Sequence, residues 1–210
     1  MVDYWKGQHR TELFGALVLS GEGHYAAQGR HCFQLTYVYD GLSAYVGRSP
    51  THKFVWVLRN PFSVIRSMLY NWDTQFSLNE LFDVCGAALL SDEEKALYAH
   101  YGPTCFSLVK RAALSYNGKV SQVFSLYNAL GAEQLLVLDY DALVADKLKV
   151  LPALYAFVDL PYHAHYADKI YRHTSRRKRR DLSEEDKAYI ASLCLPVYEQ
   201  AKSFCQDFSS

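Results

Sequence analysis

The feature that most constrains the fold is an apolar run that ends in a basic residue and is followed by a helix start. Residues 54–58 read Phe-Val-Trp-Val-Leu, which is typical of a strand buried on both faces of a parallel sheet. Asn60 and Pro61 then have the pattern of a helix N-cap followed by proline in the first turn. The segment predicts a buried strand and an amphipathic helix, whose apolar face carries Val64, Ile65, Met68, Leu69 and Trp72.

Arg59 stands between this strand and this helix. A cation at the carboxyl end of a buried strand, facing a helix N-terminus, forms a natural anion site. Ligands of open α/β sheets bind at the carboxyl ends of the strands, which favours this interpretation. The alternative is an ordinary strand-to-helix turn in which Arg59 is only solvated.

The spacing around Arg59 resembles a nucleotide-binding segment. Arg59 and Ser67 are eight residues apart in the pattern Lys-x-x-x-x-Leu-Arg-Asn-Pro-x-x-x-x-x-Ser, which begins at Lys53. It is similar to the segment by which sulfotransferases hold the 3'-phosphate of 3'-phosphoadenosine 5'-phosphosulfate (PAPS). The resemblance implies that Arg59 and Ser67 bind the 3'-phosphate of this co-substrate.

A second segment with the same resemblance follows an apolar run at residues 134–140. Tyr140-Asp-Ala-Leu143 is followed, after eight residues, by Pro152-Ala-Leu-Tyr-Ala-Phe-Val-Asp-Leu-Pro161. The sulfotransferase pattern Tyr-Glu-x-Leu … Phe-Leu-Gly-Leu-Pro, which follows a late core strand, looks similar. In that family the segment is structural, so it supports the fold and says little about the chemistry.

The third segment is strongly basic. Six of the nine residues from Arg172 to Arg180 are Arg or Lys, and Ser183 with Asp186 then predicts the start of a final amphipathic helix. In sulfotransferases a basic loop near the C-terminus closes over the 3'-phosphate, which implies this role for Arg176, Arg177 and Lys178. The alternatives are a solvated basic loop, a nuclear-localisation signal or a nucleic-acid patch.

The reacting half of a sulfotransferase site has no match in the sequence. The family grips the 5'-phosphosulfate with a loop of the Pro-Lys-Ser-Gly-Thr-Thr type, and residues 1–58 contain no such loop. Tyr37 stands where the family's catalytic His is expected, and Glu22 and His24 are possible replacements, so the general base stays unknown. We expect residues 1–210 to form a single sulfotransferase-like domain that lacks the first strand and its phosphate loop.

Composition excludes several other classes of protein. Lys+Arg and Asp+Glu balance at 22 each, so no net charge attracts the chain to nucleic acid or to a membrane. No apolar stretch approaches the roughly 20 residues of a membrane span, and the N-terminus lacks a signal-peptide pattern. Five scattered cysteines predict reduced thiols in a cytoplasmic protein, with neither a disulfide framework nor a metal site.

The remaining elements are predicted from caps and periodicity. Capping boxes at Ser77–Glu80 and Ser91–Glu94 each predict a helix start. A long helical region begins near Pro103, with an expected interruption at Gly118 and an end at Gly131. Two strands, near Phe54–Leu58 and Leu135–Leu138, should be central. We expect an α/β fold similar to P-loop nucleotide-binding proteins, with a parallel sheet of about four or five strands flanked by helices.

Two functions of different classes remain open. The first is a PAPS-dependent sulfotransferase that modifies a hydroxyl or amine of an unknown small-molecule or carbohydrate acceptor. The second is a non-catalytic relative, which retains the fold as a nucleotide-binding or interaction module. In either case a missing first strand would expose a sheet edge, which a homodimer could cover.

Overall fold

The computed structural model describes residues 52–71, 75–170 and 181–206, without the side chains of Gln75, Phe76 and Lys169. The chain divides into two compact units, residues 1–52 and residues 53–210. The fold described below is that of the second unit.

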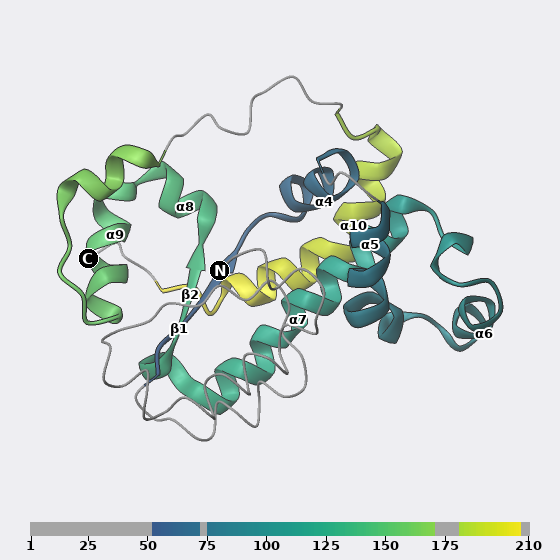
Figure 1. The fold of residues 1–210 in the computed structure, drawn as a ribbon, viewed down its shortest axis with the longest axis horizontal. Coiled ribbons are helices and arrows are strands. Elements are labelled where there is room, and N and C mark those ends of the chain that lie inside the picture. The colour runs from purple at the N-terminus through teal and green to yellow at the C-terminus, as the bar shows by residue number, and fades with distance from the viewer. Residues whose placement is uncertain (1–51, 72–74, 171–180, 207–210) are drawn as a thin grey trace. The chain divides into compact units, whose positions relative to one another are not determined.

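Two parallel strands form the sheet of the described residues (Figure 1). β1 (Phe54–Leu58) pairs with β2 (Leu135–Asp139) so that Phe54 lies opposite Leu135 and Leu58 lies opposite Asp139. The parallel α/β arrangement confirms the predicted fold class. The expectation of about four or five strands extends to residues 1–51, which lie outside the described part of the chain.

The two strands differ in burial. Every residue of β2 is buried, and its second edge is covered where Val137 forms a parallel bridge with Cys205. In β1 only alternate side chains are covered, because Val55 is 37% and Val57 is 56% exposed. The prediction that β1 is buried on both faces is therefore wrong, since an apolar run fits a strand with one covered face equally well.

α4 (Pro61–Tyr70) begins where the sequence predicted a helix start. The side chain of Asn60 accepts a hydrogen bond from the backbone N–H of Ser63 at 2.9 Å, and Pro61 occupies the first turn. Ile65 and Met68 are buried on the apolar face. The N-cap, the proline and the apolar stripe together fix where β1 gives way to α4.

The middle of the chain is helical. α6 begins at the predicted capping box of Ser91 and Glu94. The box predicted at Ser77 is wrong, because that residue lies inside α5, which has already begun at Gln75. The elements in order are α5 (Gln75–Leu81), the π-helical turn η2 (Phe82–Gly86), the 3₁₀ turn η3 (Ala87–Leu89), α6 (Asp92–Tyr101), the 3₁₀ turn η4 (Pro103–Cys105) and α7 (Leu108–Gln134).

α7 passes through Gly118 without the predicted interruption. The glycine serves packing instead, since a Cβ atom there would lie 1.8 Å from the carbonyl oxygen of Cys85 in η2. Gly131 has a φ of 64°, and the helical geometry breaks there, as predicted. This break directs the chain from α7 into β2.

The elements after β2 pack near the carboxyl end of that strand, and the final helix packs along α7. α8 (Tyr140–Ala145), α9 (Lys147–Phe157) and the 3₁₀ turn η5 (Ala164–Lys169) follow β2. α10 (Glu184–Lys202) starts with Ser183 as its N-cap, as predicted, and runs beside α7 (Figure 1). Asn117 of α7 donates a hydrogen bond to the carbonyl of Leu193 in α10 at 2.8 Å, which fixes this packing.

Candidate functional site

The site is built where β1 and β2 end side by side. Leu58 and Asp139 are the last pair in the strand register. The residues that follow them, Arg59 and Tyr140, therefore leave the sheet at the same edge. The carboxyl edge of a parallel sheet is where α/β folds bind ligands.

Arg59 is held at this edge from two directions. Its backbone carbonyl accepts a hydrogen bond of 2.8 Å from the hydroxyl of Tyr116 in α7. Its guanidinium carbon lies 4.7 Å from the centre of the Tyr140 ring, which is a cation–π contact. Burial raises the pKa of Tyr116, so its hydroxyl stays a neutral donor to the Arg59 carbonyl.

Two carboxylates tie the strand ends together. One oxygen of Asp139 accepts hydrogen bonds from the backbone N–H groups of Asp141 and Ala142, at 2.8 and 3.4 Å, and caps α8. Asp141 in turn accepts a 2.7 Å hydrogen bond from the side-chain amide of Asn60. The residue that caps α4 is thus fixed to the residues that begin α8.

Ser67 lies in the second turn of α4, and its side chain is half-buried. Its Oγ accepts a hydrogen bond of 3.0 Å from the amide of Asn71. A hydroxyl that accepts one hydrogen bond still has its own O–H to donate. The structure thus places Arg59 before α4 and Ser67 within it, on one continuous strand–helix unit.

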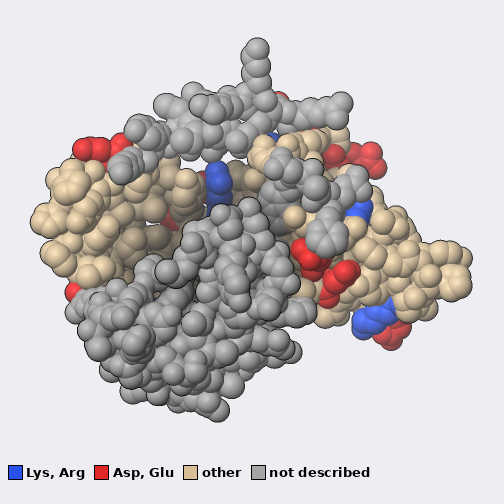
Figure 2. All heavy atoms as spheres, viewed as in Figure 1, with Lys and Arg blue, Asp and Glu red and all other residues tan. Residues whose placement is uncertain are grey.

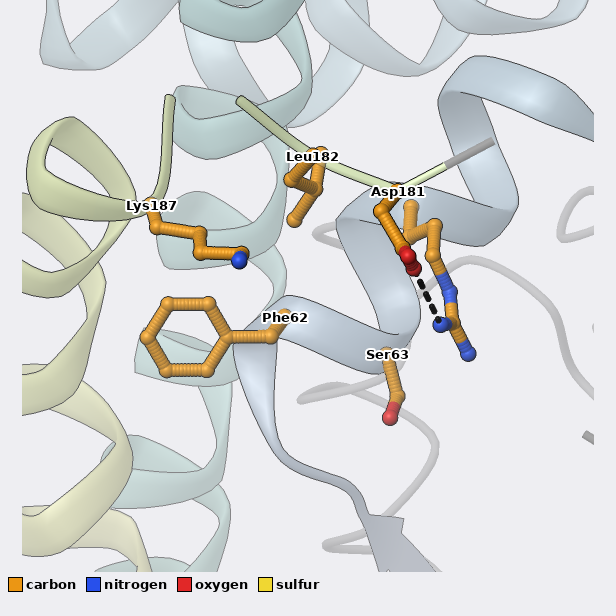
Figure 3. Close-up of a pocket in the computed structure, with 6 residues that line it drawn as sticks. Phe62, Ser63, Asp181, Leu182 and Lys187 are labelled. Carbon is orange, nitrogen blue, oxygen red and sulfur yellow. Dashed lines mark ion pairs between the residues drawn. The ribbon is translucent and has the colours of Figure 1, made fainter. Parts of the chain in front are cut away.

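A hollow of about 330 Å³ lies between the start of α4 and the start of α10 (Figure 3). In the close-up, the Phe62 ring and the Lys187 side chain lie near one another on one side, and Ser63 and Asp181 lie on the other. Arg66 forms an ion pair with Asp181, with 3.8 Å between Nη1 and Oδ1. The residues that line the hollow are Phe62, Ser63, Arg66, Asp181, Leu182 and Lys187.

The predicted basic residues Arg176, Arg177 and Lys178 lie outside the described residues. The described residues on either side of this segment are nevertheless anchored. Lys147 donates a hydrogen bond of 2.7 Å to the carbonyl of Ile170, and Asp181 pairs with Arg66 of α4. Asp181, the first described residue after this segment, therefore lies beside the same helix that carries Ser67.

Charge is mixed over the described surface that Figure 2 shows. Acidic and basic side chains are scattered there among uncharged ones, without a broad region of one sign. Glu22, His24 and Tyr37, the residues considered for the general base, lie outside the described part of the chain. Among the described residues there is no group of three or more His, Cys, Asp or Glu that could hold a metal ion.

Sequence reasoning missed the residues that support Arg59. Tyr140 and Asp141 belong to a segment that was interpreted as structural, and Tyr116 was counted only as part of a helical region. The signal for Tyr140 was present, because it follows the second buried strand as Arg59 follows the first. Tyr116 had no such signal, since its contact with Arg59 spans 57 residues.

None of the helices in the described ranges is long and apolar enough to cross a membrane.

A family model described as the sulfotransferase family matches residues 31–164, more than half of the chain. Among solved structures, the chain is similar to the sulfotransferase domain from the curacin biosynthetic pathway, with 14% sequence identity and a TM-score of 0.41. That similarity covers 77% of this chain and 57% of that one, so the chain spans less than two thirds of the solved domain. No curated protein matches the chain.

Proposed function

The chain belongs to the sulfotransferase family, and we propose that it transfers a sulfuryl group from PAPS to a hydroxyl or amine of a small-molecule or carbohydrate acceptor. The observation that carries the proposal is the position of Arg59, which follows β1 at the carboxyl edge of the sheet and forms a cation–π contact with Tyr140. Family and geometry both point to anion binding at this edge.

Arg59 is suited to a phosphate group. The cation–π contact with Tyr140 holds the guanidinium near the ring, and phosphate recognition uses the N–H donors of the guanidinium. The hydrogen bond from Tyr116 to the Arg59 carbonyl fixes the backbone from which this side chain extends. A preorganised cation loses less conformational freedom when it binds its ligand.

Ser67 and the basic segment extend this phosphate site. Ser67 has a hydroxyl proton to donate to a phosphate oxygen, since its Oγ is oriented by Asn71. We propose that Arg176, Arg177 and Lys178 add further positive charge to this site. Asp181, the first described residue after them in the sequence, pairs with Arg66 of α4. Sulfuryl transfer needs a firmly held donor and compensation of negative charge, because its transition state is loose and anionic.

A binding experiment tests the proposal without requiring turnover. Isothermal titration with adenosine 3',5'-bisphosphate should show saturable binding to the wild type. Arg59→Ala should weaken it by about tenfold or more, because charge-assisted hydrogen bonds contribute about 1.5–3 kcal/mol each. Lys53→Ala is the matched control, because it also removes one positive charge but at the amino end of β1, away from Arg59. There Lys53 donates a hydrogen bond to the Glu133 carbonyl. Equal affinity of the wild type and Arg59→Ala would remove Arg59 from the site.

The second candidate is a relative that binds the nucleotide without transferring the sulfuryl group. One observation favours it: residues 1–58 contain no loop of the Pro-Lys-Ser-Gly-Thr-Thr type. A transfer assay with PAPS and a panel of phenols, amines and sugars separates the two candidates. Release of adenosine 3',5'-bisphosphate that depends on an acceptor supports the enzyme, and binding without release supports the alternative.

A further inference from the structure

α7 carries a buried cation that the proposed nucleotide site does not use. Arg111, in the first turn of that helix, is only 4% exposed. Its Nη1 donates a hydrogen bond to Oδ1 of Asn79 in α5, and its Nε is buried without a hydrogen-bond partner. None of the ion pairs between described residues includes Arg111.

A buried guanidinium without a carboxylate is unfavourable for the folded state. Arginine stays charged in proteins and has five N–H donors in a planar fork. A neutral amide oxygen compensates only part of that charge, and the loss of hydration is large. Burial accordingly lowers the pKa of Arg111. An apolar side chain would fill this position at a lower free-energy cost, so its charge needs another explanation.

Asn79 supplies a second donor at the same place. Its Oδ1 accepts the hydrogen bond from Arg111, whereas its Nδ2 makes no hydrogen bond with the described residues. Asn79 is only half-buried, so a ligand can approach from its side. A planar guanidinium beside an amide N–H₂ group matches the oxygen atoms of a carboxylate, sulfate or phosphate group.

This position is distinct from the Arg59 site. Arg111 precedes Tyr116, the residue that binds the Arg59 carbonyl, by five positions on α7. Five residues of an α-helix correspond to a rise of about 7.5 Å and a rotation of about 140°. Tyr116 therefore points to the sheet edge, and Arg111 points to α5 on a different side of the helix.

We infer that Arg111 and Asn79 form a second oxyanion site, which takes a carboxylate, sulfate or phosphate group of a small molecule. The inference does not depend on sulfuryl transfer, because it rests on the buried charge and its neighbours. The planar guanidinium can bind any of these three groups, so the test below measures each oxyanion separately.

The test measures the melting temperature of the protein with succinate, sulfate or phosphate, against sodium chloride at the same ionic strength. At least one oxyanion should raise the melting temperature of the wild type in a saturable way. Arg111→Met should lose this response and should be at least as stable as the wild type in chloride alone, because it removes a buried charge. Arg111→Lys should weaken the affinity by about tenfold, since it keeps the charge and loses the fork.

Two further variants complete the test. Asn79→Ala removes the amide at a half-buried position and should weaken oxyanion binding severalfold, which keeps the inference testable if Arg111→Met does not fold. Sulfate and phosphate can also bind at the proposed Arg59 site, so Arg59→Ala should keep the part of the response that Arg111→Met loses. Loss of the whole response in Arg59→Ala would assign the oxyanion binding to the nucleotide site and overturn the inference. A wild type that responds to oxyanions no more than to chloride overturns the inference. An unchanged response in both Arg111→Met and Asn79→Ala also overturns it.

Discussion

The guanidinium of Arg59 lies 4.7 Å from the centre of the Tyr140 ring, although the two residues are far apart in the sequence. The parallel pairing of Leu58 with Asp139 brings Arg59 and Tyr140 together, because Arg59 follows Leu58 and Tyr140 follows Asp139. The contact joins the first of the three sulfotransferase-like segments to the second. The segment that begins at Tyr140, which looked purely structural, thus contacts Arg59, the residue proposed to bind the phosphate.

We predict that Tyr140→Leu weakens binding of adenosine 3',5'-bisphosphate by about two- to fivefold, whereas Tyr140→Phe leaves it nearly unchanged. A cation–π contact of this kind contributes about 0.5–1 kcal/mol, and phenylalanine retains the ring face. Isothermal titration of the two variants measures the difference. Equal losses in both variants would indicate that the hydroxyl of Tyr140, and not its ring, matters.

Asn60→Ala should destabilise the fold by about 1–2 kcal/mol. The substitution removes the N-cap of α4 and the 2.7 Å hydrogen bond to Asp141, and loss of an N-cap alone typically costs about 1 kcal/mol. Urea unfolding monitored by circular dichroism measures the change. Asn71→Ala, at the other end of the helix, is the control and should have a much smaller effect; comparable losses would contradict this role of Asn60.

Gly118→Ala should be among the most destabilising single substitutions, with a loss of about 3 kcal/mol or more. The added Cβ would lie 1.8 Å from the Cys85 carbonyl oxygen, so α7 and η2 must separate. Overpacking typically costs about 1–3 kcal/mol and occasionally more. Gly131→Ala is the comparison, because no atom lies within 4 Å of its added Cβ. Its φ of 64° and ψ of 177° lie in a backbone region that is essentially restricted to glycine, so strain alone should cost about 1–3 kcal/mol. If Gly118→Ala unfolds at the same urea concentration as the wild type, the close packing is wrong.

Stability should fall as the pH rises above about 9. Burial raises the pKa of Cys194 from 9.0 to about 12, and burial together with the Asp139 carboxylate raises the pKa of Cys205 to about 11. Above pH 9 the unfolded chain loses these protons while the folded chain keeps them. The folded state then binds more protons, so the free energy of unfolding decreases with pH.

Urea unfolding between about pH 8.5 and pH 10.5 measures this decrease. Cys194→Ala should flatten the pH dependence, because alanine has no proton to lose. Loss of packing in this variant lowers the free energy of unfolding by the same amount at every pH, so it does not change the slope. A slope identical to that of the wild type would show that Cys194 ionises at its ordinary pKa in the folded protein.

Local sequence signals predicted much of the fold. The start of α4 at Asn60, the capping box at Ser91 and the break at Gly131 each depend on a few neighbouring residues. Gly118 could not be interpreted correctly, because its role depends on the Cys85 carbonyl, far away in the sequence. The burial of β1 was also misjudged, since burial depends on which elements cover a strand.

The candidate site was predictable in part. Arg59 and Ser67 stand in one short segment with recognisable spacing. Tyr116 and Asp141 contact this segment only after α7 and β2 have packed against it. Arg111 had no sequence signal at all, because a cation in a helix is usually solvated. Its buried position became visible only with α5 beside it.

The role of Arg59 is tested by comparing adenosine 3',5'-bisphosphate with adenosine 5'-monophosphate, which lacks the 3'-phosphate. Titration of the wild type should show that the bisphosphate binds at least about tenfold more tightly, because we propose that Arg59 and Ser67 bind the additional phosphate. In Arg59→Ala this preference should shrink to a few-fold or less. A wild type without any preference, or a preference that persists unchanged in Arg59→Ala, would contradict the assignment of Arg59 to the 3'-phosphate.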